Sequence, residues 1–340
     1  MSIKICFRNF FCAVLIFGNP FCDRIVRVSE DFLPSHALTK SSTTVITERE
    51  KFDAFWANAT QHSETTIPWL VGGSGTNVTK VLARLGEDCT IFGIVGADEM
   101  GREIITRLTK IGVTSSLQVA QLDTGIVNCY ITPDAHRTMQ AYVDPRIFGR
   151  QEDIPPALFQ KKKFVLVEGY TAYFGDRIEK VIELAQQNQA KVSLDLASLD
   201  VVDKFKSRIK ACISKVDYLF GNEQEMLAFT GCKTVQEAVE SFPLSLTVVA
   251  TMGPKGCWVK AEGQSVAAHY DTPEVQQVID TTGAGDFFLA GFMHGVMRNK
   301  DIPECVKIAQ TAALYVIQEE GADLPEDKWA DLKHAVTVSS

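Results

Sequence analysis

Residues 278–287 read Val278-Ile-Asp280-Thr-Thr-Gly283-Ala-Gly285-Asp286-Phe287, which predicts the end of a strand, a glycine-rich turn and the start of a helix. Gly283 and Gly285 allow a ligand to approach the backbone closely. Free N–H groups at a helix N-terminus, with the helix dipole behind them, favour a bound anion. Asp286 lies in that first turn, where its carboxylate could accept a proton from an attacking hydroxyl. The stretch therefore predicts phosphoryl transfer, although a glycine turn followed by a dipole-favoured Asp has the same sequence.

Around this turn, short β-branched runs alternate with amphipathic segments. Phe164–Glu168 is an apolar strand, and Asp176 with Glu179 resembles a capping box at the start of the next helix. The expected elements that follow are strand 192–196, strand 218–220, helical stretch 222–241, strand 246–251 and helices 285–299 and 303–319. This alternation predicts an α/β fold, a doubly wound and mostly parallel sheet flanked by helices, formed by residues 1–340 as a single domain.

Two segments, at about 23–47 and 114–143, interrupt the alternation. Residues such as Val119, Ile126, Asn128 and Tyr130 alternate in the manner of exposed antiparallel strands. We expect the two segments to pair as a small β-stranded lid that covers a ligand and excludes water. Two ordinary hairpins that decorate the domain are the alternative.

Composition excludes several classes of protein. Of 340 residues 46% are hydrophobic and 22% are charged, as in ordinary globular proteins. The net charge is 34 − 42 = −8, which opposes binding to nucleic acid. No apolar run reaches the ~18 residues of a membrane span, so no membrane partner is expected. No G-x-x-x-x-G-K-[ST] loop occurs, which excludes a P-loop nucleotide site. Ile91 stands where a dinucleotide-binding G-x-G-x-x-G motif needs its first glycine, which argues against an NAD-dependent enzyme.

Cysteine usage and the N-terminus bear on the compartment. The nine cysteines form no C-x-x-C pair, which favours a reduced, cytoplasmic protein. Lys4 and Arg8 precede the apolar run Phe10–Phe17 and loosely imitate a signal peptide. A buried first strand that ends at Gly18-Asn19-Pro20 explains the same residues, and we expect that strand.

The stretch from Asp280 to Asp286 resembles the D-T-x-G-A-G-D signature of the ribokinase-like kinases, also called the PfkB family of sugar and nucleoside kinases. Further signatures of that family follow in order between about residues 14 and 325. The resemblance implies that Asp286 is the catalytic base, and that Gly283, Ala284 and Gly285 hold the transferring phosphate of ATP. It also places Asp280 and Thr282 at the border of a monovalent-cation site, which could take K⁺.

Two further motifs concern the acceptor substrate. Gly72-Gly73-Ser-Gly-Thr-Asn77 resembles the family's G-G-x-x-x-N, in which the glycines form a hinge and the Asn binds a substrate hydroxyl. Gly18-Asn19-Pro-Phe-Cys-Asp23 resembles the G-N-P-x-x-D of adenosine kinases, so Asp23 would bind ribose hydroxyls with Asn19 beside it. Without the resemblance, Asn77 could be a helix-start residue and Asp23 a solvated loop residue.

Two motifs concern the nucleotide. Asn222-Glu-Gln-Glu225 resembles the family's N-x-x-E, which positions Mg²⁺ through its waters. Thr251-Met-Gly253-Pro-Lys-Gly256 resembles the nucleotide-side strand and turn, so Thr251, Gly253 and Gly256 would border ATP. Polar residues at a helix start and a simple hairpin turn are the respective alternatives.

The remaining choices concern the substrate. Arg137 resembles the lid arginine of adenosine kinases that contacts phosphate, and Tyr170 could stack on a base or belong to the core. We expect a kinase that phosphorylates the 5′-hydroxyl of a purine nucleoside, as a monomer or homodimer. Asp195 and Gly75-Thr76 depart from the usual adenosine kinase residues, which keeps a sugar kinase for ribose or fructose as the alternative. A non-catalytic ligand-binding protein of the same fold is a third hypothesis.

Overall fold

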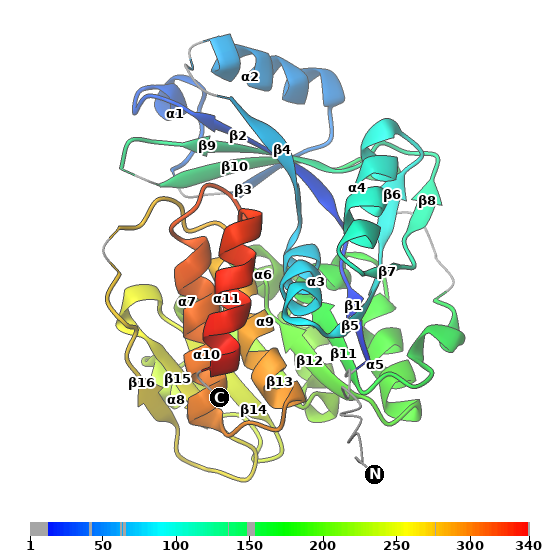
Figure 1. Ribbon diagram of the computed structural model, residues 1–340, viewed down its shortest axis with the longest axis vertical. Helices are drawn as coiled ribbons and strands as arrows, with labels where there is room; N and C mark the ends of the chain where they lie inside the picture. The colour runs from blue at the N-terminus through cyan, green and yellow to red at the C-terminus, as the bar shows by residue number, and fades with distance from the viewer. Residues whose placement is uncertain are drawn as a thin grey trace, which may run out of the picture.

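The computed structural model describes residues 13–40, 43–61, 63, 66–134, 136–147, 154–275 and 277–338, and a nine-stranded sheet forms its centre (Figure 1). In spatial order its strands are β16 (Ala268–Tyr270), β15 (Cys257–Lys260), β14 (Thr247–Thr251), β13 (Tyr218–Asn222), β12 (Lys191–Asp195), β11 (Phe164–Glu168), β1 (Ala13–Phe17), β5 (Asp88–Phe92) and β7 (Thr114–Ser115). All neighbours pair in parallel except at β15 and β16, which are antiparallel. The predicted doubly wound, mostly parallel sheet is confirmed.

Helices cover both faces of this sheet, because alternate strand residues enter two different cores. In β1, Val14 and Ile16 belong to one core while Leu15 and Phe17 belong to the other. The first core also contains residues of α3 (Ser74–Leu85), α4 (Glu99–Lys110), α9 (Ala284–Met297), α10 (Ile302–Val316) and α11 (Glu326–Val338). The second contains residues of α5 (Arg177–Gln187), α6 (Leu199–Cys212), α7 (Glu223–Thr230) and α8 (Val235–Glu240). Strands buried on both faces explain the nearly continuous apolar runs in the sequence.

The chain reverses its direction across the sheet at β1. From β1 the chain passes to β5 on one side, and it later returns to β11 on the other side. In open α/β sheets, ligands bind outside the carboxyl ends of the strands at such a switch point. The residues at or just beyond these ends are Gly18, Glu168, Asp195 and Asn222.

A second, five-stranded sheet lies beyond the carboxyl end of β1 (Figure 1, top). Its strands in spatial order are β3 (Thr43–Ile46), β10 (Arg137–Tyr142), β9 (Ile126–Ile131), β2 (Phe21–Arg27) and β4 (Thr66–Gly72), and α1 (Phe32–Ser35) and α2 (Arg49–Gln61) pack against it. The segments expected at 23–47 and 114–143 supply β2, β3, β9 and β10, while β4 was not expected. Residues 41, 42 and 135 lie outside the described residues.

The first residues of the segment expected at 114–143 do not belong to the small sheet. β7 extends the large sheet beside β5, and β8 (Gln118–Ala120) pairs with β6 (Ile94–Gly96) instead of joining the small sheet. The reason is the short connection from α4, which returns the chain to the edge of the large sheet before the small sheet begins.

Other expectations hold or need correction. The expected strand end at residues 278–280 is wrong, because Ile279 and Asp280 donate their N–H groups to the carbonyl of Ile317 and pair with no strand in the described part of the chain. The expected helical stretch 222–241 is two helices, since Gly231 ends α7 in the left-handed conformation (φ +83°). The long helices expected near 285–299 and 303–319 are α9 and α10.

The first strand forms as β1, although Phe10 to Cys12 of its apolar run lie outside the described residues. Within the described ranges, no helix combines the length and apolar character needed to cross a lipid bilayer. The seven described cysteines are all free thiols.

Candidate active site

Asp286 lies where the N-termini of α3 and α9 meet. It is the third residue of α9, which begins after the N-cap residue Gly283. Its carboxylate accepts hydrogen bonds from Ser74 Oγ (2.7 Å) and Asn77 Nδ2 (2.8 Å), both in the N-terminal part of α3. Burial raises the pKa of Asp286, while the hydrogen bonds from Asn77 and Ser74 oppose that increase. The two hydrogen bonds favour the charged carboxylate, which is the form that can accept a proton.

The turn before α9 is packed against Ala322 at Gly283 and open at Gly285. Gly283 adopts the left-handed conformation (φ +75°), and a Cβ there would lie 2.7 Å from Ala322 Cβ. Gly285 is exposed, and a Cβ at its position would meet no atom within 4 Å. The first N–H groups of an α-helix have no acceptor within the helix. Ala284 N donates to Thr281 O (3.3 Å), so the N–H groups of Gly283 and Gly285 are the ones best placed to hold an anion beside Asp286.

Asp280 fixes this turn through hydrogen bonds to Thr282 and Gly321. Its buried carboxylate accepts hydrogen bonds from Thr282 N (2.9 Å) and Thr282 Oγ1 (2.6 Å), and its other oxygen accepts one from Gly321 N (2.9 Å). The two side chains expected at the border of a cation site are thus bonded to each other. Their observed role is to fix the turn against residue 321.

Asp23 lies against the backbone of Gly72. A Cβ at residue 72 would be 1.9 Å from Asp23 Oδ2, so only glycine leaves room for this carboxylate. Burial raises the pKa of Asp23 to about 6, although the positive charges of Lys80 and Arg137 lower it. The positive charge of Arg137 also lowers the pKa of Asp286, so it acts on both carboxylates.

Two buried oxygen atoms near Asp286 lack a hydrogen-bond partner within the described residues. They are Asp23 Oδ1 and Asn77 Oδ1. Unpaired buried acceptors are costly, and a ligand that brings hydroxyl donors would satisfy them. The arrangement thus fits a polyhydroxylated substrate beside the Asp286 carboxylate.

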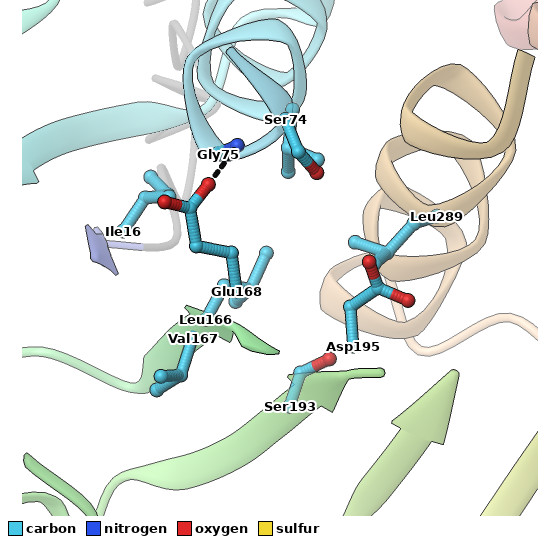
Figure 2. A pocket seen from close by; sticks show the side chains of 10 residues that line it. Ile16, Ser74, Gly75, Leu166, Val167, Glu168, Ser193, Asp195 and Leu289 are labelled. Carbon is cyan, nitrogen blue, oxygen red and sulfur yellow. Dashed lines mark hydrogen bonds between the residues drawn. The ribbon is translucent and has the colours of Figure 1, made fainter. Parts of the chain in front are cut away.

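Glu168, at the end of β11, joins two backbone segments of the site. Its Oε1 accepts a hydrogen bond from Asn19 N (3.1 Å), and its Oε2 accepts one from Gly75 N (2.8 Å; Figure 2). Burial raises the pKa of Glu168 to about 7. Asn19 Oδ1 accepts a hydrogen bond from Ile94 N (3.0 Å), so its side-chain oxygen joins β6 to the turn after β1. Gly73, at φ +94°, passes too close to Asn19 O for a side chain.

Asn222 and Glu225 form a capping box at the start of α7. Asn222 Oδ1 accepts from Glu225 N (3.0 Å), and Glu225 Oε2 accepts from Asn222 N (2.9 Å). The alternative of polar residues at a helix start is thus the observed local structure. Burial raises the pKa of Asp195 well above its usual value, and the negative charges of Glu225 and Asp286 raise it further. Buried carboxylates that repel each other are a setting that a bound cation relieves.

The remaining predicted residues lie along the same edge. Thr251 ends β14 in register with Asn222, and Gly253 (φ +56°) and Gly256 (φ +91°) shape the hairpin turn into β15. Tyr170 follows β11 in a 3₁₀ turn (Gly169–Tyr173) and is 37% exposed, which excludes a fully buried core position.

Comparison with known proteins identifies the family. A family model described as "pfkB family carbohydrate kinase" matches residues 42–329, which is most of the chain. The chain belongs to the PfkB family. Kinases of this family use ATP, generally with Mg²⁺, and the protein is accordingly a phosphotransferase that acts on a hydroxyl group.

Individual relatives of this PfkB kinase are named after different substrates. Adenosine kinase from Saccharomyces cerevisiae is 25% identical over 335 residues, covering 93% of this chain and 97% of its own. A solved probable sugar kinase from Rhizobium etli CFN 42 is 26% identical with a TM-score of 0.83, covering 95% of this chain and 98% of its own. A solved adenosine kinase from Sinorhizobium meliloti has a TM-score of 0.85 at 24% identity, covers 95% and 99%, and supports the fold alone.

Sequence reasoning on this PfkB kinase did not identify three side chains that hold the site together, namely Ser74, Glu168 and Lys80. Ser74 occupies a variable position of the G-G-x-x-x-N motif, and Glu168 was noted only as the end of a strand. Lys80 is buried and donates to Val71 O (2.6 Å), Ala322 O (2.7 Å) and Asp323 Oδ2 (3.2 Å). The available signals were a Glu at the carboxyl end of an apolar strand and a Lys between the apolar residues of a helix.

Proposed function

We propose that the protein transfers the γ-phosphoryl group of ATP to the 5′-hydroxyl of a purine nucleoside, with Asp286 as the general base. The observation that carries this proposal is the Asp286 carboxylate, held by Ser74 and Asn77 beside an open glycine turn at a helix N-terminus. The hydroxyl proton passes to Asp286 while the hydroxyl oxygen attacks the γ-phosphorus. The bond between that phosphorus and the bridging oxygen of ADP breaks, and ADP leaves.

The acceptor is held on the side of the small sheet. Asp23 and Asn77 each present a buried oxygen without a partner in the described structure, which fits two neighbouring ribose hydroxyls. Gly72 and Gly73 allow this close approach, and Asn19 positions the turn that leads into β2, the strand that carries Asp23. Tyr170, partly exposed beside the site, supplies a flat surface for a purine.

The phosphate donor is held on the other side. The N–H groups at Gly283, Ala284 and Gly285 stabilise the charge of the transferring group, and Arg137 approaches from the small sheet. Thr251, Gly253 and Gly256 border the nucleotide, with Asn222 at the end of the next strand.

Mg²⁺ would enter with ATP and reduce the charge on its phosphates. Among the described residues, no group of three or more His, Cys, Asp or Glu side chains is placed to hold a metal ion directly. The donor chemistry still fits a hydrated ion, because Asp195 and Glu225 are buried carboxylates that repel each other. Glu225 would then act through water. A monovalent cation such as K⁺ near Asp280 and Thr282 would have to use backbone oxygens, because both side chains are already bonded.

The small sheet would act as the lid over this site. Its strand β2 carries Asp23 and its strand β10 carries Arg137, so closure would bring both side chains to the substrate. Water would then be excluded from the transferring phosphate.

A sugar kinase remains the second candidate. The observation that favours it is Asp195, a buried carboxylate at the end of β12 where an adenosine kinase commonly has an amide, together with the likeness to the probable sugar kinase. In that case the same residues would hold ribose, fructose or another simple sugar, and Tyr170 would have no base to contact.

The test measures ADP formation from ATP and Mg²⁺ with adenosine, inosine, guanosine, ribose and fructose. Turnover with a purine nucleoside that is lost in Asp286→Asn supports the proposal. The matched control is Asp203→Asn on the exposed side of α6, which should retain full activity. Turnover with sugars alone would overturn the substrate and keep the base. Activity that persists in Asp286→Asn would overturn the mechanism.

A further inference from the structure

The hydroxyl of Ser74 is directed across a helix–helix contact. Ser74 is the first residue of α3, and the N-cap residue before it is Gly73, which has no side chain to cap the helix. Ser74 Oγ therefore does not cap its own helix and instead donates to Asp286 Oδ1 on α9 at 2.7 Å. Figure 2 shows its side chain pointing away from Glu168 and toward α9.

The backbone around Ser74 is fixed from the opposite side. The next residue, Gly75, donates its N–H to Glu168 Oε2, which anchors the first turn of α3 to the end of β11. A Cβ at Gly75 would lie within 3.0 Å of both Gly18 Cα and Glu168 Oε2, so the turn is tightly enclosed. The Ser74 hydroxyl is thus presented to Asp286 by a constrained backbone, and little conformational entropy remains to be lost.

We propose that Ser74 is a positioning residue for the catalytic base, whose hydroxyl holds Asp286 Oδ1 and sets the orientation of the carboxylate toward the substrate hydroxyl. This inference rests on the proposed role of Asp286 as the base. It assigns to Ser74 a task that Asn77 does not duplicate, because Asn77 donates to the other oxygen, Oδ2, at 2.8 Å.

The proposal has a consequence for the ionisation of Asp286. The Ser74 hydroxyl donates one of the two side-chain hydrogen bonds that lower the pKa of Asp286 against the effect of burial. Loss of this hydroxyl should therefore raise the pKa of Asp286 by about one unit, a tenfold change in its ionisation constant. The other groups that face Asp286 are unchanged by this substitution; they are Asn77 and Lys80 from α3, Arg137 from β10, Asp23 from β2, Glu168 from β11, Asp195 from β12 and Tyr170.

The kinetic test compares the pH profile of kcat/KM in Ser74→Ala, Ser74→Thr and the wild type. The acidic limb in Ser74→Ala should move up by about one pH unit, with roughly tenfold lower kcat/KM below the limb. Ser74→Thr keeps a hydroxyl and should restore the wild-type profile. Ser207→Ala, at an exposed position of α6, is the matched control and should show no shift. An unshifted limb in Ser74→Ala overturns the proposal.

A second measurement separates this inference from the proposed function. The carboxyl carbon of Asp286 can be titrated by NMR in protein labelled with ¹³C-aspartate, and the resonance is assigned by its absence in Asp286→Asn. An upward shift of about one unit in Ser74→Ala supports the Ser74–Asp286 interaction, and an unchanged titration overturns it. A wild-type protein that turns over none of the nucleosides or sugars would overturn the proposed function, while the titration would still decide the interaction.

Discussion

Gly72→Ala should weaken substrate binding without unfolding the protein. A Cβ at residue 72 would lie 1.9 Å from Asp23 Oδ2 and 2.2 Å from its Cγ, so the carboxylate must leave its position. The backbone itself can accommodate alanine, since Gly72 is not among the residues with positive φ. The main effect of the substitution should therefore be to move the Asp23 side chain.

The size of the effect follows from the interaction that is lost. A hydrogen bond between a substrate hydroxyl and a carboxylate contributes about 1.5–3 kcal/mol. Loss of one such bond raises Kd roughly 10- to 150-fold, since about 1.4 kcal/mol corresponds to a factor of ten. The melting temperature should stay within a few degrees of the wild type.

The assay is calorimetric titration with adenosine in a double-mutant cycle. If Gly72→Ala acts only by moving Asp23, then Asp23→Ala and the double variant should bind with the same weakened affinity. Wild-type affinity in Gly72→Ala, or effects of the two substitutions that add in full, would refute this account of the contact.

Three further predictions concern stability. The first is that Asp23→Asn becomes more stable relative to the wild type as pH rises from about 4 to 6. In the wild type the folded-state pKa of Asp23, about 6, exceeds the ordinary 3.8, so the folded state binds a proton that the unfolded state has lost. The wild type therefore loses stability as this proton is removed, and the Asn variant does not. Urea unfolding at several pH values tests this, and a difference that does not vary with pH would contradict it. Lys260→Met should lower the unfolding free energy by about 1–3 kcal/mol, because fully buried Lys260 donates to three carbonyl oxygens that would lose their partner; Lys307→Met on the exposed side of α10 is the control, and equal stability of the two variants would count against the assignment. Gly283→Ala should cost about 1–2 kcal/mol through its left-handed backbone and should also lower kcat, since its Cβ would press on Ala322; a stable variant with full activity would show that the turn tolerates a side chain.

The large sheet could be predicted because its strands are buried on both faces. Runs such as Ala13–Phe17 and Phe164–Glu168 are apolar at almost every position, and amphipathic helices follow the strands of this sheet. The strand expected at residues 278–280 does not form, because its backbone is bonded outside the sheet. Val278 and Ile279 have the composition of a strand, but Ile279 and Asp280 donate to Ile317 O at the end of α10, a partner that local sequence does not specify.

The site was predictable where a backbone constraint demands glycine. Gly72, Gly73 and Gly283 each lie where a Cβ would collide with a named neighbour, so their spacing carries information in the sequence. Ser74 and Glu168 carry no such signal. Their importance arises from a contact 212 residues away in the chain and from two backbone N–H groups that only the folded sheet brings together.

The most direct test of the central claim measures nucleoside binding and turnover together in Asp286→Asn. A general base contributes roughly 10²- to 10⁴-fold to the rate, so kcat should fall by that factor while the Kd for adenosine changes by no more than a few-fold. Turnover close to the wild-type rate, or binding that is lost in parallel with activity, would contradict the assignment of Asp286 as the base.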